Sequence, residues 1–280
     1  MLPAEVHYSP IEQWQQFGLQ HLVVLGIALI GCVNLLVFRN ELRGRRVDVW
    51  LVGAMLTVHL VWIAAALGSG FAEAGDLLPL YTCDASIVAG IFWCWRKPRW
   101  LGQVIFYWAF LGGVVTLLLP DTFGYALPHF AVVYTLLFHI LLLLFGLSVW
   151  AVEGVPPTWR SLVPLVLVTS ALVPPSLVAN AAFGSDYMFV SRSPGGIFTF
   201  LNDFDGWVRV VVNLTSAFAL GMAGLLMWFA MDMLLRGPRR VEVPNAYDSV
   251  HLRRPRRMLA AIACERRSSS SRGRRSNLSG

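Results

Sequence analysis

Residues 128–151 read PHFAVVYTLLFHILLLLFGLSVWA, an apolar stretch without a single Asp, Glu, Lys or Arg. An α-helix rises 1.5 Å per residue, so about 20 such residues cross the ~30 Å hydrocarbon core of a bilayer. Hydrophobic residues make up 56% of the 280 positions and charged residues 14%, whereas soluble proteins are about a quarter charged. The stretch is therefore predicted to be a transmembrane helix in a chain built for the membrane.

Seven stretches are long and apolar enough to cross a bilayer. They lie at about 19–38, 49–68, 77–95, 101–119, 128–151, 161–181 and 210–233. Pro164, Pro174 and Pro175 interrupt the sixth stretch, and the backbone groups that they free must find partners within the protein. The predicted fold class is all-α, a polytopic membrane protein with a seven-transmembrane-helix bundle.

The cations between these stretches predict the orientation of the chain. The first and third loops carry clusters of Lys and Arg. In the N-terminal segment and the second loop, the only charged residues are acidic. Loops rich in Lys and Arg stay on the cytoplasmic side, so we expect the N-terminus outside and the C-terminus in the cytoplasm. Arg accounts for 21 of the 22 cations, which is typical of a GC-rich bacterial genome, and the expected location is a bacterial inner membrane.

The charge divides the chain into two parts. Residues 1–235 form the predicted seven-helix domain and hold 10 cations against 13 acidic residues. Residues 236–280 hold 12 Arg and 3 acidic residues in a sequence rich in Ser and Arg, so they are predicted to be a disordered cytoplasmic tail. The tail either binds anionic lipid headgroups or is simply solvated. Nucleic-acid binding is not expected, because no folded module accompanies the charge.

Polar groups are few within the spans, and their positions indicate where a site lies. An ionisable group inside a span costs roughly 2.5–3.5 kcal/mol on insertion scales, so it indicates a functional site or a buried partner. Cys83 and Asp84 stand side by side in LPLYTCDASIVAG, residues 77–89. The other candidates are His21, His59, His129, His139, Asn180 and Tyr187. Most of them are expected in the outer half of the bilayer, with His59 near the middle of its span. A shared depth is what one polar cavity open to the outer leaflet requires.

Each of these groups has a structural interpretation beside a chemical one. A membrane Cys commonly packs as a small apolar residue, and a membrane His commonly hydrogen-bonds to a neighbouring helix. Asp84 is able to pair with such a His without any catalysis. A thiol next to a His, in contrast, can take an acyl chain as a thioester and pass it to a hydroxyl group or to water. The residues alone leave these interpretations open.

Five segments in this order resemble the YwaF-like family of bacterial integral membrane proteins. They are FGLQHL, LPLYTCDAS, WAFLGGVVTLLLPD, LPHF followed by LLFHILLLL, and NAAFGSDYMF. The resemblance covers roughly residues 14–233 and implies a seven-helix bundle. The family is similar to a eukaryotic group of transmembrane acyltransferases that remodel phospholipids with a Cys and a His. Carried over by motif, the Cys is Cys83, and the His is His139 in preference to His129.

Three functions follow as hypotheses. The first is a Cys–His lipid acyltransferase or acyl hydrolase, with membrane phospholipids as the partners and substrates. The second is a transporter or channel for a small solute or protons, in which Asp84, His59, His139 and Asn180 line the path and the prolines break the sixth helix. The third is a seven-helix sensor. No metal site and no cofactor are expected, because the His and Cys residues lack ligand spacing.

Overall fold

The computed structural model describes residues 14–73, 75, 77–122, 125–189, 203–204 and 206–236. The chain divides into two compact units, residues 1–230 and 231–280. The described part of the second unit is the last turn or so of one helix, and the predicted basic tail lies outside the described residues from position 237 onward. The first unit contains six of the seven predicted stretches and most of the seventh, 210–233.

The described residues form helices and no strand, which agrees with the predicted all-α class. The elements are α1 (Leu19–Val37), α2 (Arg39–Leu42), α3 (Val47–Ser69), α4 (Thr82–Arg96), α5 (Arg99–Ile105), η2 (Phe106–Leu111), α6 (Gly112–Leu118), α7 (Phe130–Ala151), η3 (Trp159–Ser161), α8 (Leu162–Phe183), η4 (Tyr187–Phe189) and α9 (Gly206–Arg236). Among them η2 is a π-helix, and η3 and η4 are 3-10 helices.

Five of the described helical stretches are long and apolar enough to cross a membrane, and they coincide with five of the seven predicted ones. They are Leu19–Val37, Val47–Ser69, Arg99–Leu118, Phe130–Ala151 and Trp159–Phe183. The third predicted stretch appears as α4 with 15 residues, and the seventh falls in α9, where Gly221–Ala230 is a shorter apolar helix. The chain is therefore a multi-pass membrane protein.

The sixth predicted stretch differs from the expectation of a broken helix. The structure has one α-helix from Leu162 to Phe183, with Pro174 and Pro175 inside it. The expected break, which supported the transporter hypothesis, is therefore wrong for this helix.

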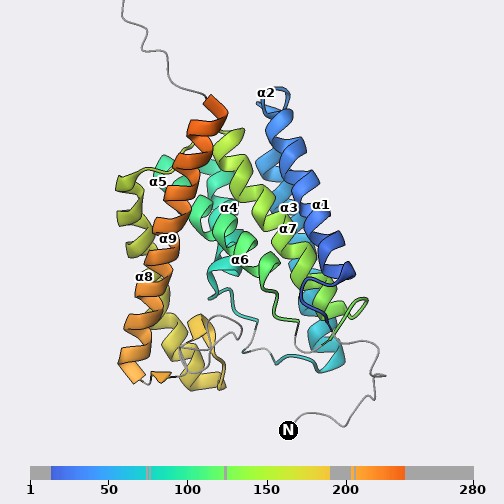
Figure 1. Cartoon of the computed structure of the whole chain (residues 1–280). Coiled ribbons are helices and arrows are strands. Elements are labelled where there is room, and N and C mark those ends of the chain that lie inside the picture. Colours follow the sequence, from blue (N-terminus) through green and yellow to red (C-terminus); the bar gives the residue numbers. More distant parts are fainter. Residues whose placement is uncertain are drawn as a thin grey trace, which may run out of the picture. The chain divides into compact units, whose positions relative to one another are not determined.

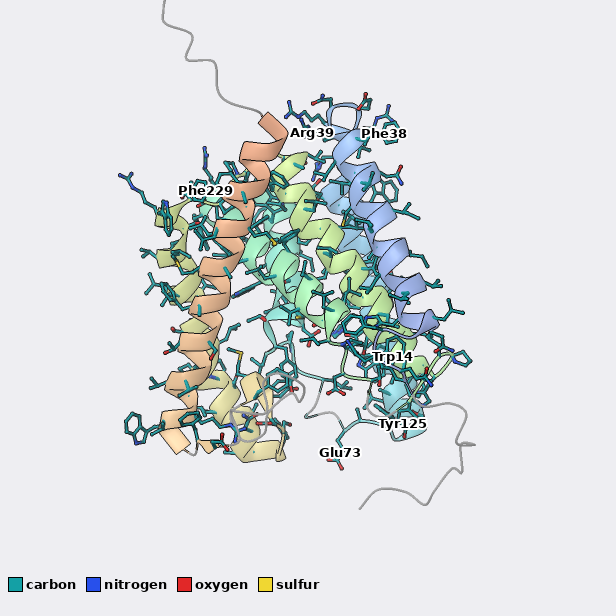
Figure 2. The ribbon with its side chains drawn as sticks, viewed as in Figure 1. Trp14, Phe38, Arg39, Glu73, Tyr125 and Phe229 are labelled. Carbon is teal, nitrogen blue, oxygen red and sulfur yellow. The ribbon has the colours of Figure 1, made fainter. Side chains whose placement is uncertain are left out.

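The two ends of the bundle are easily told apart. Helices α1, α4 and α7 begin at one end, called here the first end, and α3, α5 and α8 begin at the second end (Figure 1). Figure 2 shows Trp14, Glu73 and Tyr125 at the first end and Phe38 and Arg39 at the second. The first end is the one at which Cys83 lies, in the first turn of α4.

Helix α7 is the centre of the bundle and contacts α1, α3, α5, η2 and α6 (Figure 1). Its buried face contributes Phe138, Leu142, Phe145 and Val149 to the apolar core. Small residues bring its backbone close to the neighbouring helices, as is common in membrane bundles. A Cβ added to Gly146 would lie 2.5 Å from the Phe110 nitrogen, so no larger residue fits there without movement.

The helical stretch Arg99–Leu118 is interrupted by the six-residue π-helix η2. Two side chains of η2 tie it to the α8 side of the bundle: Tyr107 hydrogen-bonds to Ser161, and the Trp108 indole donates to Thr169 over 2.9 Å. A π-helix inside an α-helix is rare and occurs frequently at functional sites. In this chain it ends at Leu111, directly before Gly112, which faces Cys83.

An ion-pair cluster joins three helices at the second end. The carboxylate of Asp48, which is fully buried, forms ion pairs with Lys97 Nζ at 3.0 Å and with Arg46 Nε at 3.8 Å. Lys97 also pairs with Glu153. Burial acts to lower the pKa of Lys97, but its hydrogen bonds to Glu153 and Asp48 outweigh burial and raise that pKa above its ordinary value.

Candidate functional site

Cys83 and Asp84 lie in the first turn of α4, as expected for residues near the end of a span. The N-cap is Tyr81, which has extended dihedral angles and no side-chain hydrogen bond to the helix. The first hydrogen bond of the turn runs from the Ala85 nitrogen to the Tyr81 carbonyl over 2.8 Å. The backbone N–H groups of residues 82–84 therefore have no acceptor within the helix.

The Cys83 thiol is half-buried and faces the start of α6. A Cβ added to Gly112 would lie 3.2 Å from Cys83 Sγ and 3.8 Å from Leu142 of α7. Cys83 also packs against the apolar core that Ile105 and Ala109 share, and it is a free cysteine. Because Gly112 has no side chain, the sulfur can lie close to the α6 backbone.

Asp84 faces a different pair of helices. His59 of α3 lies with Nδ1 3.8 Å from the nearest Asp84 oxygen, and Tyr134 of α7 lies beside His59. The Tyr134 hydroxyl is 2.8 Å from His59 Nδ1. The structure therefore brings the predicted His59 and Asp84 together with a third polar group that the sequence analysis did not select.

His139 has one ring nitrogen engaged and one available. Its Nδ1 donates to the Thr135 carbonyl of its own helix over 2.7 Å, so Nε2 keeps its lone pair. Two leucines of α7 face the start of α6: Leu142 lies near Gly112, and Leu143 packs against Gly113. His139 lies on α7 one helical turn, about 5 Å, from these leucines toward the first end. Cys83 and His139 thus approach the same α6–α7 contact, and the described residues show no hydrogen bond between them.

His129 occupies the N-cap of α7 rather than the surroundings of Cys83. Its Nδ1 accepts from the Ala131 nitrogen at 3.3 Å, and its ring stacks on Tyr125 with 3.9 Å between centroids and 6° between planes. Burial lowers the pKa of His129, which favours the neutral ring that a hydrogen-bond acceptor at the cap requires. This arrangement gives His129 a role in starting α7.

His21 connects the start of α1 to the end of α6. The ring is fully buried, with Nε2 2.7 Å from the Leu117 carbonyl and Nδ1 accepting from the Phe17 nitrogen at 3.0 Å. Both nitrogens are therefore used in hydrogen bonds between elements, which is the role of a packing residue.

Asn180 and Tyr187 fix a loop at the first end. The Asn180 amide bonds to both the backbone nitrogen and the carbonyl of Tyr187, at 2.7 and 3.1 Å. The Tyr187 hydroxyl donates to the Gly75 carbonyl at 2.6 Å and accepts from the Leu78 nitrogen at 2.7 Å. These bonds hold η4 against the segment that leads into α4.

The eight predicted residues therefore separate into sets with different surroundings. Cys83 lies where α4 meets Gly112 of α6, His139 lies on α7 one turn from the leucines that contact Gly112 and Gly113, and His59 faces Asp84. The remaining four serve in caps, loops and ties between elements. Tyr134 and Gly112 were missed, although Tyr134 is a polar group in the middle of an apolar span and offered the same signal as His139.

The described residues contain no cluster of three or more His, Cys, Asp or Glu side chains that could hold a metal ion. A family model described as the TMEM164 family matches residues 16–228, which is most of the chain and nearly all of the first unit. No curated protein matches, and no solved structure matches.

Proposed function

This chain belongs to the TMEM164 family, and on that premise we propose that it is a lipid acyltransferase or acyl hydrolase whose nucleophile is Cys83. The observation that carries the proposal is the position of the thiol, in the first turn of α4 beside Gly112. His139 is the proposed base, since its Nε2 is available and it lies one turn from the same contact. The resemblance of the Cys and His motifs to lipid-remodelling acyltransferases gives the same assignment.

The proposed first step transfers an acyl group from a lipid ester to the sulfur. His139 Nε2 takes the thiol proton while Cys83 Sγ forms a bond to the ester carbonyl carbon. The carbonyl oxygen becomes an oxyanion, for which the backbone N–H groups of the first turn of α4 are suitable donors. The carbon–oxygen bond then breaks, and the departing lysolipid alkoxide takes the proton back from His139. The product is a thioester on Cys83.

The second step releases the acyl group. A lysolipid hydroxyl or a water molecule gives its proton to His139 and attacks the thioester carbonyl. The carbon–sulfur bond breaks, and the Cys83 sulfur takes the proton from His139. Attack by a lysolipid gives acyl transfer, whereas attack by water gives hydrolysis.

The proposal includes the predicted membrane topology. Seven spans with the N-terminus outside place the Cys83 end of the bundle at the outer leaflet of a bacterial inner membrane. The second end, with its cluster of Arg and Lys, then lies on the cytoplasmic side. The Arg-rich tail, residues 236–280, then lies at the cytoplasmic surface, where it can bind anionic headgroups.

Intact-protein mass spectrometry tests the chemistry. Purified protein is incubated with a panel of diacyl phospholipids, with Cys83→Ser and the matched variant Cys32→Ser, which removes another half-buried thiol. We expect an added acyl mass that hydroxylamine removes in the wild type and in Cys32→Ser, and none in Cys83→Ser. Folded protein that gains no acyl mass with any lipid would contradict the proposal.

A second candidate function rests on the buried polar set of His59, Tyr134 and Asp84. Ionisable groups that face the interior of a membrane bundle often mark a path for protons or solutes. A transport path would lose activity on Asp84→Asn and keep it on Cys83→Ser, because Ser preserves the size and polarity of Cys. Acyl transfer is expected to show the opposite pattern.

A further inference from the structure

Three polar side chains lie beside Cys83 and have no part in the acyl-transfer steps proposed above. The Tyr134 hydroxyl is hydrogen-bonded to His59 Nδ1 over 2.8 Å. His59 Nδ1 is itself 3.8 Å from the nearest Asp84 oxygen. A tyrosine of α7 thus orients the histidine of α3 that faces the carboxylate next to the thiol.

The direction in which this carboxylate is held matters for chemistry at the sulfur. Adjacent residues of a helix leave the axis about 100° apart, and the thiol takes the side that faces Gly112. A carboxylate that turned toward the same side would place a negative charge next to the forming thiolate and oxyanion. A like charge at close range opposes both of these species.

The ring of Tyr134 is fixed independently of its hydroxyl. Trp62 stacks on it with 4.6 Å between centroids and 9° between planes, and Phe138 stacks on it at 5.4 Å. Removing the oxygen alone therefore keeps the packing of α3 against α7 and frees His59, and with it the Asp84 carboxylate that His59 faces.

We infer that Tyr134 is a positioning residue of the Cys83 site: its hydroxyl orients His59, which keeps the Asp84 carboxylate on the α3–α7 side of α4 and away from the sulfur. The inference rests on the proposed function of Cys83 as a nucleophile. It explains why a membrane helix carries an acidic residue directly after the thiol: the carboxylate faces a histidine of another helix rather than the reacting sulfur.

The test measures the rate of thioester formation on the purified full chain, with the phospholipid that gives the fastest wild-type adduct. We expect Tyr134→Phe to slow acylation on the order of tenfold, the effect of about one pK unit of like-charge interaction. Adding Asp84→Asn to that variant is expected to restore the rate, because the released group then has no charge. Tyr107→Phe, which removes another tyrosine hydroxyl bonded to a neighbouring helix, is the matched control and is expected to keep the wild-type rate.

Each result has one meaning. A wild-type rate in Tyr134→Phe overturns the inference, and so does a slow double variant, because loss of packing would not be rescued by neutralising Asp84. A wild type that forms no thioester refutes the proposed function itself. If the wild type and Tyr107→Phe form the thioester but Asp84→Asn does not restore the rate of Tyr134→Phe, the inference is wrong and the proposed function stands.

Discussion

Single residues show how this bundle tolerates charge. Lys97 bridges Asp48 and Glu153 at the second end, where α3 begins and α4 and α7 end. A buried carboxylate that loses its partner carries an uncompensated charge, which costs far more than the pair contributes when intact. Interactions with its partners raise the pKa of Lys97. The contribution of Lys97 to folding stability is therefore fully present at any pH below the ordinary lysine pKa. It is lost only as the pH rises through the raised value.

The Lys97→Met variant tests this cluster. We expect a loss of roughly 2 kcal/mol in stability, less than for a wholly buried pair because the Lys97 side chain is partly exposed. Thermal unfolding in detergent, followed by tryptophan fluorescence, measures the change. Arg96→Met is the matched control, since the Arg96 guanidinium lies over the exposed Trp95 ring 4.1 Å from its centroid. Equal melting temperatures for the two variants would contradict the role of the cluster.

At the scale of the helices, hydropathy predicted the positions of the long elements well. The predicted stretch 128–151 became α7 (Phe130–Ala151) almost unchanged. The predicted stretch 77–95 became α4 (Thr82–Arg96) instead, and before it Gly75 and Leu78 form hydrogen bonds with the Tyr187 hydroxyl. The π-helix η2 was not predictable, since it reflects how one helix fits against its neighbours rather than the apolar pattern of its own residues.

The same limit applies to the site. The sequence supplied Cys83, Asp84 and the histidines, because polar residues stand out in apolar stretches. It could not separate His139 from His129, since that choice depends on which helices meet at Gly112 and Gly113. The arrangement of Asp84, His59 and Tyr134 depends in the same way on the packing of α4 beside α3 and α7.

Close helix contact at α7 predicts a steep penalty for larger residues there. Gly146→Val would drive a side chain into the η2 backbone, and overpacking of this kind costs typically 1–3 kcal/mol. Gly53→Val is the matched control, because an added Cβ at Gly53 of α3 meets nothing within 4 Å. We expect Gly146→Val to lower the melting temperature and Gly53→Val to leave it nearly unchanged, and similar values would argue against the close packing.

For the whole molecule, the decisive question is whether α4 crosses the membrane. Its 15 residues reach about 22 Å as a helix, which is short of the ~30 Å hydrocarbon core. The segment that precedes α4 can supply the rest, since an extended chain advances about 3.3 Å per residue. The hydrogen bonds from Tyr187 to this segment satisfy part of its backbone within the protein, as non-helical backbone at membrane depth requires.

Labelling of single cysteines therefore tests the predicted topology. In a background with the four native cysteines replaced by Ser, we expect Glu73→Cys to react with a membrane-impermeant maleimide in intact cells. Arg43→Cys and Arg99→Cys are expected to react only after the membrane is permeabilised, since they lie in the two predicted cytoplasmic loops. Labelling of positions 73 and 99 from the same side would show that α4 does not cross. Labelling of 43 and 99 in intact cells, with 73 protected, would reverse the orientation and place the Cys83 end toward the cytoplasm.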